Sequence, residues 1–271
     1  MRRGRLRVKK SKRLPQLLII LISIYLLIPF VVTFIYSLST EWVGIIPSGF
    51  TVKNYVELFQ DMDFWLSVGR TLVICVVSVS ISIALLLGVM FVVTMYAPWL
   101  GKYIQFICMI PYALQGVILS ISIVSLFSGT GTFLSNRMMM LFGAYSIMVL
   151  PYIYQGIRNN LNAINSKMLV DAAQMLGAGR LYAFFRVVIP NIMPGVIVSS
   201  LLAVSIVFGD FVLANNIAGN NYQNIQVYLY VNMTKSSSKA SAIVVLIFVV
   251  VFGITGTVLW LQNKGKKVAG R

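Results

Sequence analysis

The sequence contains no histidine and little acid, with six aspartates and glutamates among 271 residues. Histidine is the commonest metal ligand and the most frequent general base, so its absence removes the usual basis for metal binding and acid–base catalysis. The two cysteines, Cys75 and Cys108, both lie within apolar runs, which is typical of small buried hydrophobes and not of a disulfide framework. We therefore expect no bound metal, no disulfide and no enzymatic activity in this chain.

Charge is scarce as well, because 10% of the residues are charged and 59% are hydrophobic, with a mean hydropathy of +0.89. These values identify an integral membrane protein. The net charge of +16 would favour nucleic acid as the partner of a soluble protein. Eight of the basic residues, however, occupy the first thirteen positions, directly before an apolar run, where the positive-inside rule and anionic lipid headgroups account for them. We expect contact with membrane lipids and none with nucleic acid.

Six apolar runs are long enough to cross about 30 Å of hydrocarbon. They cover residues 15–38, 66–95, 103–127, 138–157, 192–214 and 240–262. Helices are expected, because unpaired backbone groups are costly in lipid and the runs lack the alternation of a transmembrane barrel. The first run is longer than a signal-peptide core and no small-x-small cleavage site follows it, which indicates an uncleaved first span. The predicted fold class is an all-α integral membrane protein with six transmembrane helices.

The basic residues also predict the orientation of the chain. They gather in an N-terminal segment (1–14), in the turn after the second span, between the fourth and fifth spans, and in a tail (263–271). By the positive-inside rule, both termini and the segment between the fourth and fifth spans are cytoplasmic, in a multi-pass protein of the cell membrane. The loop after the first span is acidic instead. Its residues 54–59 (NYVELF) predict a short amphipathic helix on the outer surface.

A more polar stretch, DAAQMLGAGRLYAFFRVVIP at residues 171–190, separates the fourth and fifth apolar runs. It predicts one helix at 167–176, with Ser166 as its N-cap, and a second helix at 180–187. Gly177 can end the first helix in a left-handed conformation, and Gly179 lets the chain turn again. Two interpretations are open on these grounds: an interfacial helix pair on the inner leaflet, or a docking surface for a cytoplasmic partner.

The spacing within this stretch resembles the EAA loop of ATP-binding-cassette (ABC) importer permeases. That pattern is Glu-Ala-Ala, three residues, Gly, nine residues and Ile-x-Leu-Pro; the matching residues here are Asp171, Ala172, Ala173, Gly177, Val187, Ile189 and Pro190, with conservative departures at Asp171, Val187 and Ile189. The resemblance covers about residues 15–262 and implies the permease domain of a type I importer, with a coupling loop at about 158–191. It implies that residues 166–190 dock on a separate ATPase subunit. ATP and magnesium are expected on that partner, since this chain has no GxxxxGK[ST] phosphate loop.

Further partners are implied by the same resemblance: two copies of the ATPase, a second permease subunit and an extracytoplasmic substrate-binding protein. A homodimeric and a heterodimeric pore both stay open. Residues 208–230 and the NYVELF segment are similar to bacterial permeases of the spermidine/putrescine branch, which implies a polyamine substrate. Relatives of that branch carry ferric iron or 2-aminoethylphosphonate, which are the alternatives. A secondary transporter or channel would use more intramembrane ionisable residues than these spans offer.

Asp210 is the clearest charge at membrane depth and is predicted to bind a cation on the substrate pathway. A carboxylate wetted at a helix end is the alternative. Arg70 is interpreted either as snorkelling to headgroups or as the counter-ion of Asp210. Asn215 lies in a predicted outer loop that can line the gate.

A weak repeat adds candidates to this pathway, with PYALQG at 111–116 and PYIYQG at 151–156. Its residues Tyr112, Gln115, Tyr152 and Gln155 would face inward if the repeat is meaningful, as the broken helices of transporters do. Coincidence is the alternative, because Pro and Gly are frequent in membrane helices and Tyr at their ends.

Overall fold

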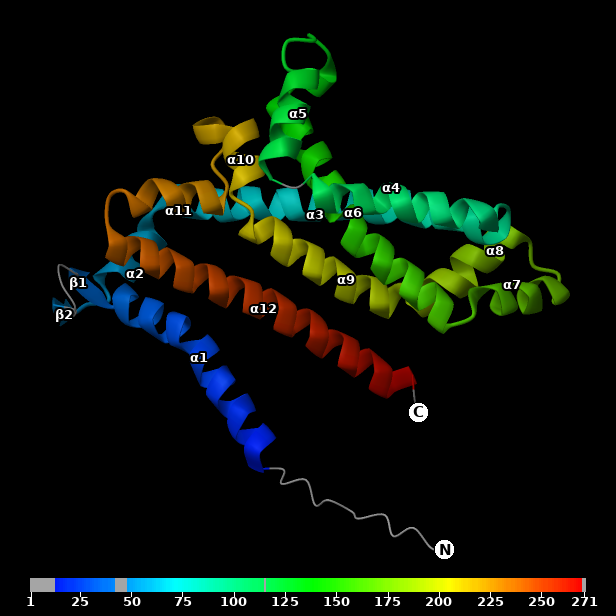
Figure 1. The fold of residues 1–271 in the computed structure, drawn as a ribbon, viewed down its shortest axis with the longest axis horizontal. Coiled ribbons are helices and arrows are strands. Elements are labelled where there is room, and N and C mark those ends of the chain that lie inside the picture. Colours follow the sequence, from blue (N-terminus) through cyan, green and yellow to red (C-terminus); the bar gives the residue numbers. More distant parts are fainter. Residues whose placement is uncertain (1–12, 42–47, 115, 270–271) are drawn as a thin grey trace, which may run out of the picture.

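The computed structural model describes residues 13–41, 48–114 and 116–269, and most of them are helical (Figure 1). The longer helices are α1 (Arg13–Ser37), α3 (Met62–Met95), α4 (Gly101–Ala113), α5 (Val117–Phe127), α6 (Arg137–Ala163), α9 (Ile189–Gly209) and α12 (Ser237–Ala269). The shorter ones are α2 (Lys53–Gln60), α7 (Ser166–Met175), α8 (Arg180–Ala183), α10 (Val212–Ile217) and α11 (Ile225–Met233). Single turns are η1 (Pro98–Leu100), η2 (Phe133–Ser135), η3 (Phe184–Val188) and η4 (Gly219–Tyr222). Strands β1 (Ser39–Glu41) and β2 (Ser48–Phe50) form an antiparallel hairpin.

The membrane-spanning helices confirm the predicted fold class. Within the described part of the chain, five helices are long and apolar enough to cross a membrane, and α4 with α5 gives a sixth crossing if this bent pair is one span. Helices α1, α3, α6 and α12 contain most of the first, second, fourth and sixth predicted spans. The predicted surface helix at 54–59 is α2, in which Leu58 is the buried residue.

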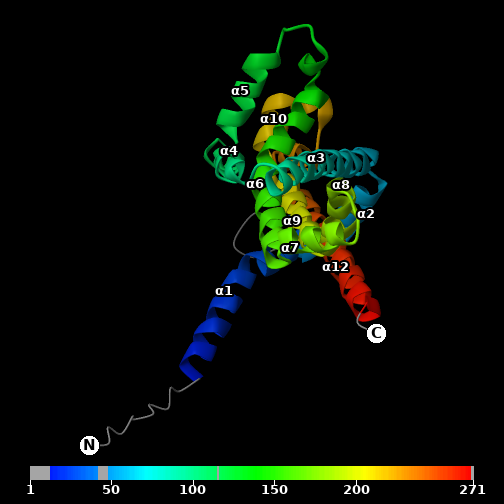
Figure 2. The ribbon, with the colours of Figure 1, turned by 90° about the vertical axis from the view of Figure 1, so that its right-hand side faces the viewer.

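The third apolar run is not the continuous span that the sequence predicted. It divides into α4 and α5, which are bent by 102° to each other. Gly116 adopts a positive φ of +70° at the bend, a conformation that costs little without a β-carbon. Pro111, inside α4, also removes one backbone donor from the last turns of that helix. Figure 2 shows α5 pointing away from the long axis of the other helices.

The fifth span begins earlier and ends earlier than predicted. Residues Arg180–Gly209 form one helical run of 30 residues, in which α8, the π-helical turn η3 and α9 follow one another without a break. The π-helical turn precedes Pro190, so a proline that the sequence suggested as a boundary sits within a continuous helix. The run ends at Asp210, whose backbone is extended, and not at the predicted residue 214.

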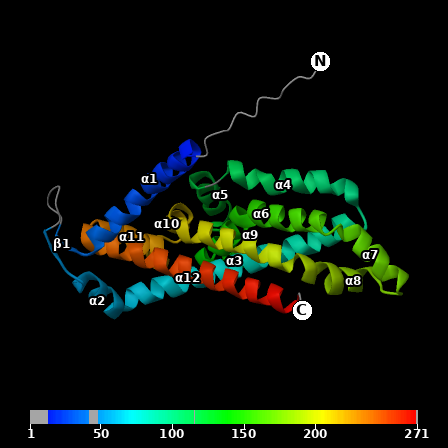
Figure 3. The same cartoon turned by 90° about the horizontal axis from the view of Figure 1, so that it is seen from below.

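The long helices run between two ends of the molecule, which Figure 3 shows from below. Helices α7 and α8 lie at one end, called here the elbow end. The hairpin β1–β2, α2 and α11 lie at the other, called here the hairpin end. Two side-chain hydrogen bonds join elements there: Ser37 Oγ in α1 with Tyr55 Oη in α2 at 2.6 Å, and Ser39 Oγ in β1 with Ser238 Oγ in α12 at 3.2 Å.

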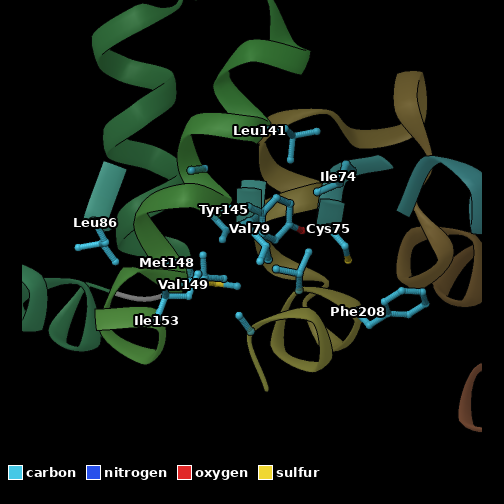
Figure 4. Packing of buried hydrophobic residues seen from close by; sticks show 14 of the residues in the cluster. Ile74, Cys75, Val79, Leu86, Leu141, Tyr145, Met148, Val149, Ile153 and Phe208 are labelled. Atoms are coloured by element: carbon cyan, nitrogen blue, oxygen red, sulfur yellow. The ribbon is translucent and has the colours of Figure 1, made fainter. Parts of the chain in front are cut away.

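Helix α6 is the centre of the core and packs against α3, α4 and α9. Figure 4 shows its Tyr145, Met148, Val149 and Ile153 among buried side chains of α3 and α9. Serine hydroxyls link α3 to α6: Ser82 donates to the Ser146 carbonyl at 3.0 Å, and Ser146 donates to the Ser78 carbonyl at 3.3 Å. Small hydroxylated residues allow such close contact between membrane helices. Both cysteines are buried, as the sequence predicted.

Candidate functional site

The polar stretch between α6 and α9 forms a rigid elbow. Helix α7 ends in a Schellman motif, in which the Ala178 N–H donates to the Ala173 carbonyl at 3.0 Å and the Gly177 N–H donates to the Gln174 carbonyl at 2.9 Å. Gly177 has a φ of +84°, as its sequence position predicted. The turn therefore depends on one glycine, and its direction is fixed by two backbone hydrogen bonds.

Two details of the predicted elbow are wrong. Ser166 is not the N-cap of α7, because it is a buried residue of the first turn and the cap position is Asn165, which has a φ of +49° and no side-chain cap bond. The second predicted helix at 180–187 is not separate, because it continues through η3 into α9. The elbow is thus one short helix joined to the start of a long one.

The elbow presents apolar side chains at its tip. Met175 and Leu176 are 91% and 90% exposed, whereas Val170 is buried on the opposite side of α7, which packs against η3. Asp171 is exposed between these faces, and it lines a cleft of about 130 Å³ together with Lys167 and Arg180. Exposed apolar side chains beside a carboxylate are suited to binding another protein.

The other residues of the EAA-like motif also include both exposed and packed positions. Ala172 is exposed, and Ala173 is half-buried where it packs against the core. Ile189 and Pro190 are the first two residues of α9. Because α8, η3 and α9 are continuous, the second half of the elbow and α9 belong to one helical run.

Asp210 lies where α9 ends and α10 begins. Its Oδ2 accepts hydrogen bonds from the Tyr145 hydroxyl at 3.0 Å and from the Leu213 N–H at 2.9 Å. The helix break is stabilised further by α11 and its N-cap: Gln226 donates to the Phe208 carbonyl at 2.7 Å, and Asn224 donates to the Asp210 carbonyl at 3.5 Å. These amides satisfy carbonyls that the end of a helix leaves without a partner.

Asp210 also lines a cleft of about 390 Å³ between α6 and α9. The cleft is lined by Gly116, Met148, Ser205, Ile206, Gly209 and Asp210. Among the described residues, this lining includes one carboxylate and no lysine or arginine. Arg70 is not the counter-ion of Asp210: its guanidinium lies over the Tyr222 ring at 5.0 Å, and the ion pairs recorded among the described side chains are Lys53–Glu57 and Lys239–Asp61.

The repeat of PY-x-x-QG brings side chains together in space. The rings of Tyr112 in α4 and Tyr152 in α6 are 5.1 Å apart, with an interplanar angle of 75°. Gln155 Nε2 donates to the Tyr112 hydroxyl at 3.4 Å and approaches the sulfur of Met109 at 3.7 Å. Gln115, the fourth candidate from the repeat, lies outside the described residues.

Asn215 is half-buried in α10, and its position does not test the predicted role at a gate. Its neighbour Asn216 donates to Ser120 Oγ at 2.8 Å and so connects α10 to α5. Sequence reasoning did not select Tyr145 or Met148, although both contribute to the surroundings of Asp210. The sequence signal that could have found them is their helical spacing from Tyr152 and Gln155, which places all four residues on one face of the same helix.

Comparisons to known proteins agree with this fold of apolar membrane-spanning helices. The family model described as "Binding-protein-dependent transport system inner membrane component" matches residues 80–264. The chain belongs to this family. It is therefore a permease component of a type I ABC importer and not a catalytic subunit, and its family is one of multi-pass inner membrane proteins.

Named relatives of this permease differ in their substrates. The chain is 24% identical over 246 residues to the putrescine transport system permease protein PotI of Escherichia coli (strain K12), covering 87% of this chain and 85% of PotI. It is 24% identical over 212 residues to the spermidine/putrescine transport system permease protein PotC of the same strain, covering 76% and 77%. It is also 24% identical over 195 residues to the putative 2-aminoethylphosphonate transport system permease protein PhnV of Salmonella typhimurium (strain LT2), covering 70% and 71%.

Solved structures agree with the fold. A chain of a bacterial alginate ABC transporter, in complex with an alginate pentasaccharide-bound periplasmic protein, superposes with a TM-score of 0.65 at 17% identity. The match covers 97% of this permease and 98% of that chain. At this identity the likeness establishes the architecture, and the substrate has to be argued from the residues of the cleft.

Proposed function

We propose that this permease carries polyamines, with spermidine or putrescine as the substrate of the complete importer. The observation that carries the proposal is that Asp210 lines a cleft and that its carboxylate accepts from two neutral donors, the Tyr145 hydroxyl and the Leu213 N–H. A carboxylate at membrane depth without a cationic partner attracts a cation. The relatives named for putrescine and spermidine support the same substrate class.

The cleft favours a polyamine over the two alternatives. A phosphonate group is normally bound by arginine or lysine, and the described residues that line the cleft include neither. Ferric iron is a hard cation that requires several oxygen ligands, whereas no group of three or more His, Cys, Asp or Glu side chains occurs in the described residues. The cleft therefore fits an organic cation best.

Coupling to ATP hydrolysis is proposed to run through residues 166–190. The exposed Met175 and Leu176 and the carboxylate of Asp171 would seat in a groove of a separate ATPase, which binds ATP and magnesium. Two ATPase copies, a second permease subunit and an extracytoplasmic binding protein would complete the importer. Both termini and the elbow would then be cytoplasmic, with the hairpin end outside.

The test is ATPase stimulation in the reconstituted complex, with the binding protein present and with spermidine, putrescine, ferric iron or 2-aminoethylphosphonate added in turn. We expect stimulation by the polyamines. Stimulation by iron or by the phosphonate alone would refute the polyamine proposal. A complex in which the ATPase does not copurify with the permease would refute the proposed coupling.

A further inference from the structure

A stripe of side chains on α6 leads away from the Asp210 cleft. Tyr145, Met148, Tyr152 and Gln155 follow one another at intervals of three and four residues, so they lie on one face of the helix. Tyr145 bonds to Asp210, Met148 lines the cleft, and Tyr152 and Gln155 contact Tyr112. Asp210 and the tyrosine pair are therefore connected by one row of α6 side chains, called here the strip.

The separation along this strip is short. Tyr152 is four residues beyond Met148, which corresponds to about 6 Å along the helix axis. Burial changes over the same distance, because Tyr145 and Met148 are buried, Tyr152 is half-buried and Gln155 is exposed. The row of side chains thus passes from the buried core at Tyr145 to an exposed position at Gln155.

The tyrosine pair can bind a second positive charge. Tyrosine ring faces attract cations, and Tyr112, which packs in a T-shaped contact with Tyr152, is 41% exposed. Gln155 donates through its amide nitrogen, and its amide oxygen is an acceptor that an ammonium N–H can use. No side chain named in this cluster carries a positive charge that would repel an amine.

We propose that the strip binds an extended dication at two points, with one ammonium group at Asp210 and the second at the Tyr112–Tyr152 pair beside Gln155. This inference rests on the proposed polyamine function and adds a mode of recognition to it. Two charged contacts joined by an apolar wall at Met148 select a chain with separated amines and a methylene linker. A monoamine of the same length makes only one of the two contacts.

The experiment measures thermal stabilisation of the purified complete importer, and its ATPase stimulation with the binding protein present, across α,ω-diaminoalkanes of increasing chain length and matched monoamines. Two-point binding predicts an optimum chain length for diamines. Tyr152→Leu should weaken the response to diamines by roughly 3- to 30-fold, the range given by a cation–π contact, and leave the response to monoamines unchanged. The matched control is Tyr103→Leu in α4, whose ring lies 6.1 Å from that of Trp99 and off the strip.

Asp210 needs a separate control because it also bonds to the first turn of α10. Asp210→Asn should abolish the response to diamines and to monoamines. Gln226→Leu removes the hydrogen bond to the Phe208 carbonyl at the same helix break, keeps the carboxylate and should keep both responses. Equal loss in these two variants would show that Asp210 is structural and would overturn the inference.

Two further outcomes separate the inference from the proposed function. If wild-type importer responds to diamines but Tyr152→Leu matches Tyr103→Leu, or if chain length has no effect, the two-point site is refuted and the polyamine function stands. If wild type responds to no amine at all, the polyamine function itself fails.

Discussion

Tyr228 in α11 donates a 2.6 Å hydrogen bond from Oη to Oδ2 of Asp61, the residue before α3. The same oxygen lies 3.6 Å from Nζ of Lys239 in the first turn of α12, and Oδ1 accepts from the Asp63 N–H at 3.0 Å. One carboxylate therefore joins α3, α11 and α12 at the hairpin end. Two of these contacts involve charge and partial burial, so they contribute more than an exposed ion pair.

The stability of the permease should depend on pH through Asp61. Burial raises the pKa of this carboxyl, but the hydrogen bonds from Tyr228 and Asp63 and the charge of Lys239 lower it, and the net pKa is below its ordinary value. A lowered pKa in the folded state gives stability that is present above the unfolded value of about 3.9 and is lost as the pH falls through the folded value. Thermal unfolding of wild type and Asp61→Asn in detergent should show a difference at neutral pH that disappears in acid.

Two variants check the source of this effect. Tyr228→Phe should cost about 1–2 kcal/mol at neutral pH, because it removes a hydrogen bond to a partly buried charge. Glu57→Gln is the matched control, since the Lys53–Glu57 pair is 3.7 Å long and both side chains are largely exposed. If Glu57→Gln and Asp61→Asn lower the stability of the permease equally, the contacts of Asp61 contribute no more than an exposed ion pair does.

The close contact of α6 with α9 gives a second prediction. A β-carbon on Gly156 would overlap the side chain of Ser199, and a β-carbon on Gly195 would overlap the amide of Asn160. Gly156 of α6 thus faces Ser199 of α9, and Gly195 of α9 faces Asn160 of α6. In each helix the glycine and the polar residue are four positions apart. Gly156→Ala should destabilise the fold by about 1–3 kcal/mol, because a packed seam has no room for the added methyl group.

Gly143→Ala is the control in the same helix, since nothing lies within 4 Å of a β-carbon built there. Alanine also has the higher helix propensity, so this change should leave the melting temperature unchanged or raise it. Equal melting temperatures for the two variants in detergent would contradict the seam described here.

Hydropathy was sufficient to predict most of the helices. It failed at the bend in the third apolar run and at the start of the fifth span, where local backbone geometry sets the helix boundaries. Runs such as those of α3 and α12 are apolar over their whole length, so their position follows from lipid burial alone. The bend at Gly116 has no such signal, because the run on both sides of it is apolar. The continuous helix through Pro190 was missed because proline usually marks a boundary, and the π-helical turn that accommodates it depends on packing of Phe184 against Phe91 and other core residues.

The sequence was sufficient to select individual candidate residues, but it did not predict which side chains they contact. Asp210 was selected because a charge at membrane depth is costly, and that reasoning needs no structure. Its partner Tyr145 is 65 positions away and resembles any other buried tyrosine in the sequence. Arg70 was the nearest expected cation, yet Tyr222 in the loop after α10 takes its guanidinium instead. The repeat selected Tyr112 and Tyr152 as inward-facing residues without predicting their contact, and their role in transport stays a prediction.

The elbow gives the last prediction, which concerns coupling. Gly177→Pro should uncouple ATP hydrolysis from uptake, because proline requires a φ near −65° where the chain has +84° and also removes the N–H that bonds to Gln174. Asp171→Arg should do the same by reversing the charge beside the tip.

Leu176→Asp should weaken association with the ATPase by about tenfold or more, equivalent to about 1.4 kcal/mol, since this side chain is exposed in the free permease and would be buried in the complex. Copurification of the ATPase and uptake into proteoliposomes measure these effects.

Gly179→Ala is the control for the glycine change. Gly179 has a φ of −68°, and a β-carbon there meets nothing within 4 Å, so alanine fits the existing conformation. Membrane insertion and thermal stability of the spans should be preserved in Leu176→Asp, because Leu176 makes few contacts within the permease. Unchanged uptake in both Gly177→Pro and Asp171→Arg would show that the elbow does not couple the two subunits. It would then favour the interfacial helix pair, in which Met175 and Leu176 lie among lipid headgroups and not in a protein groove.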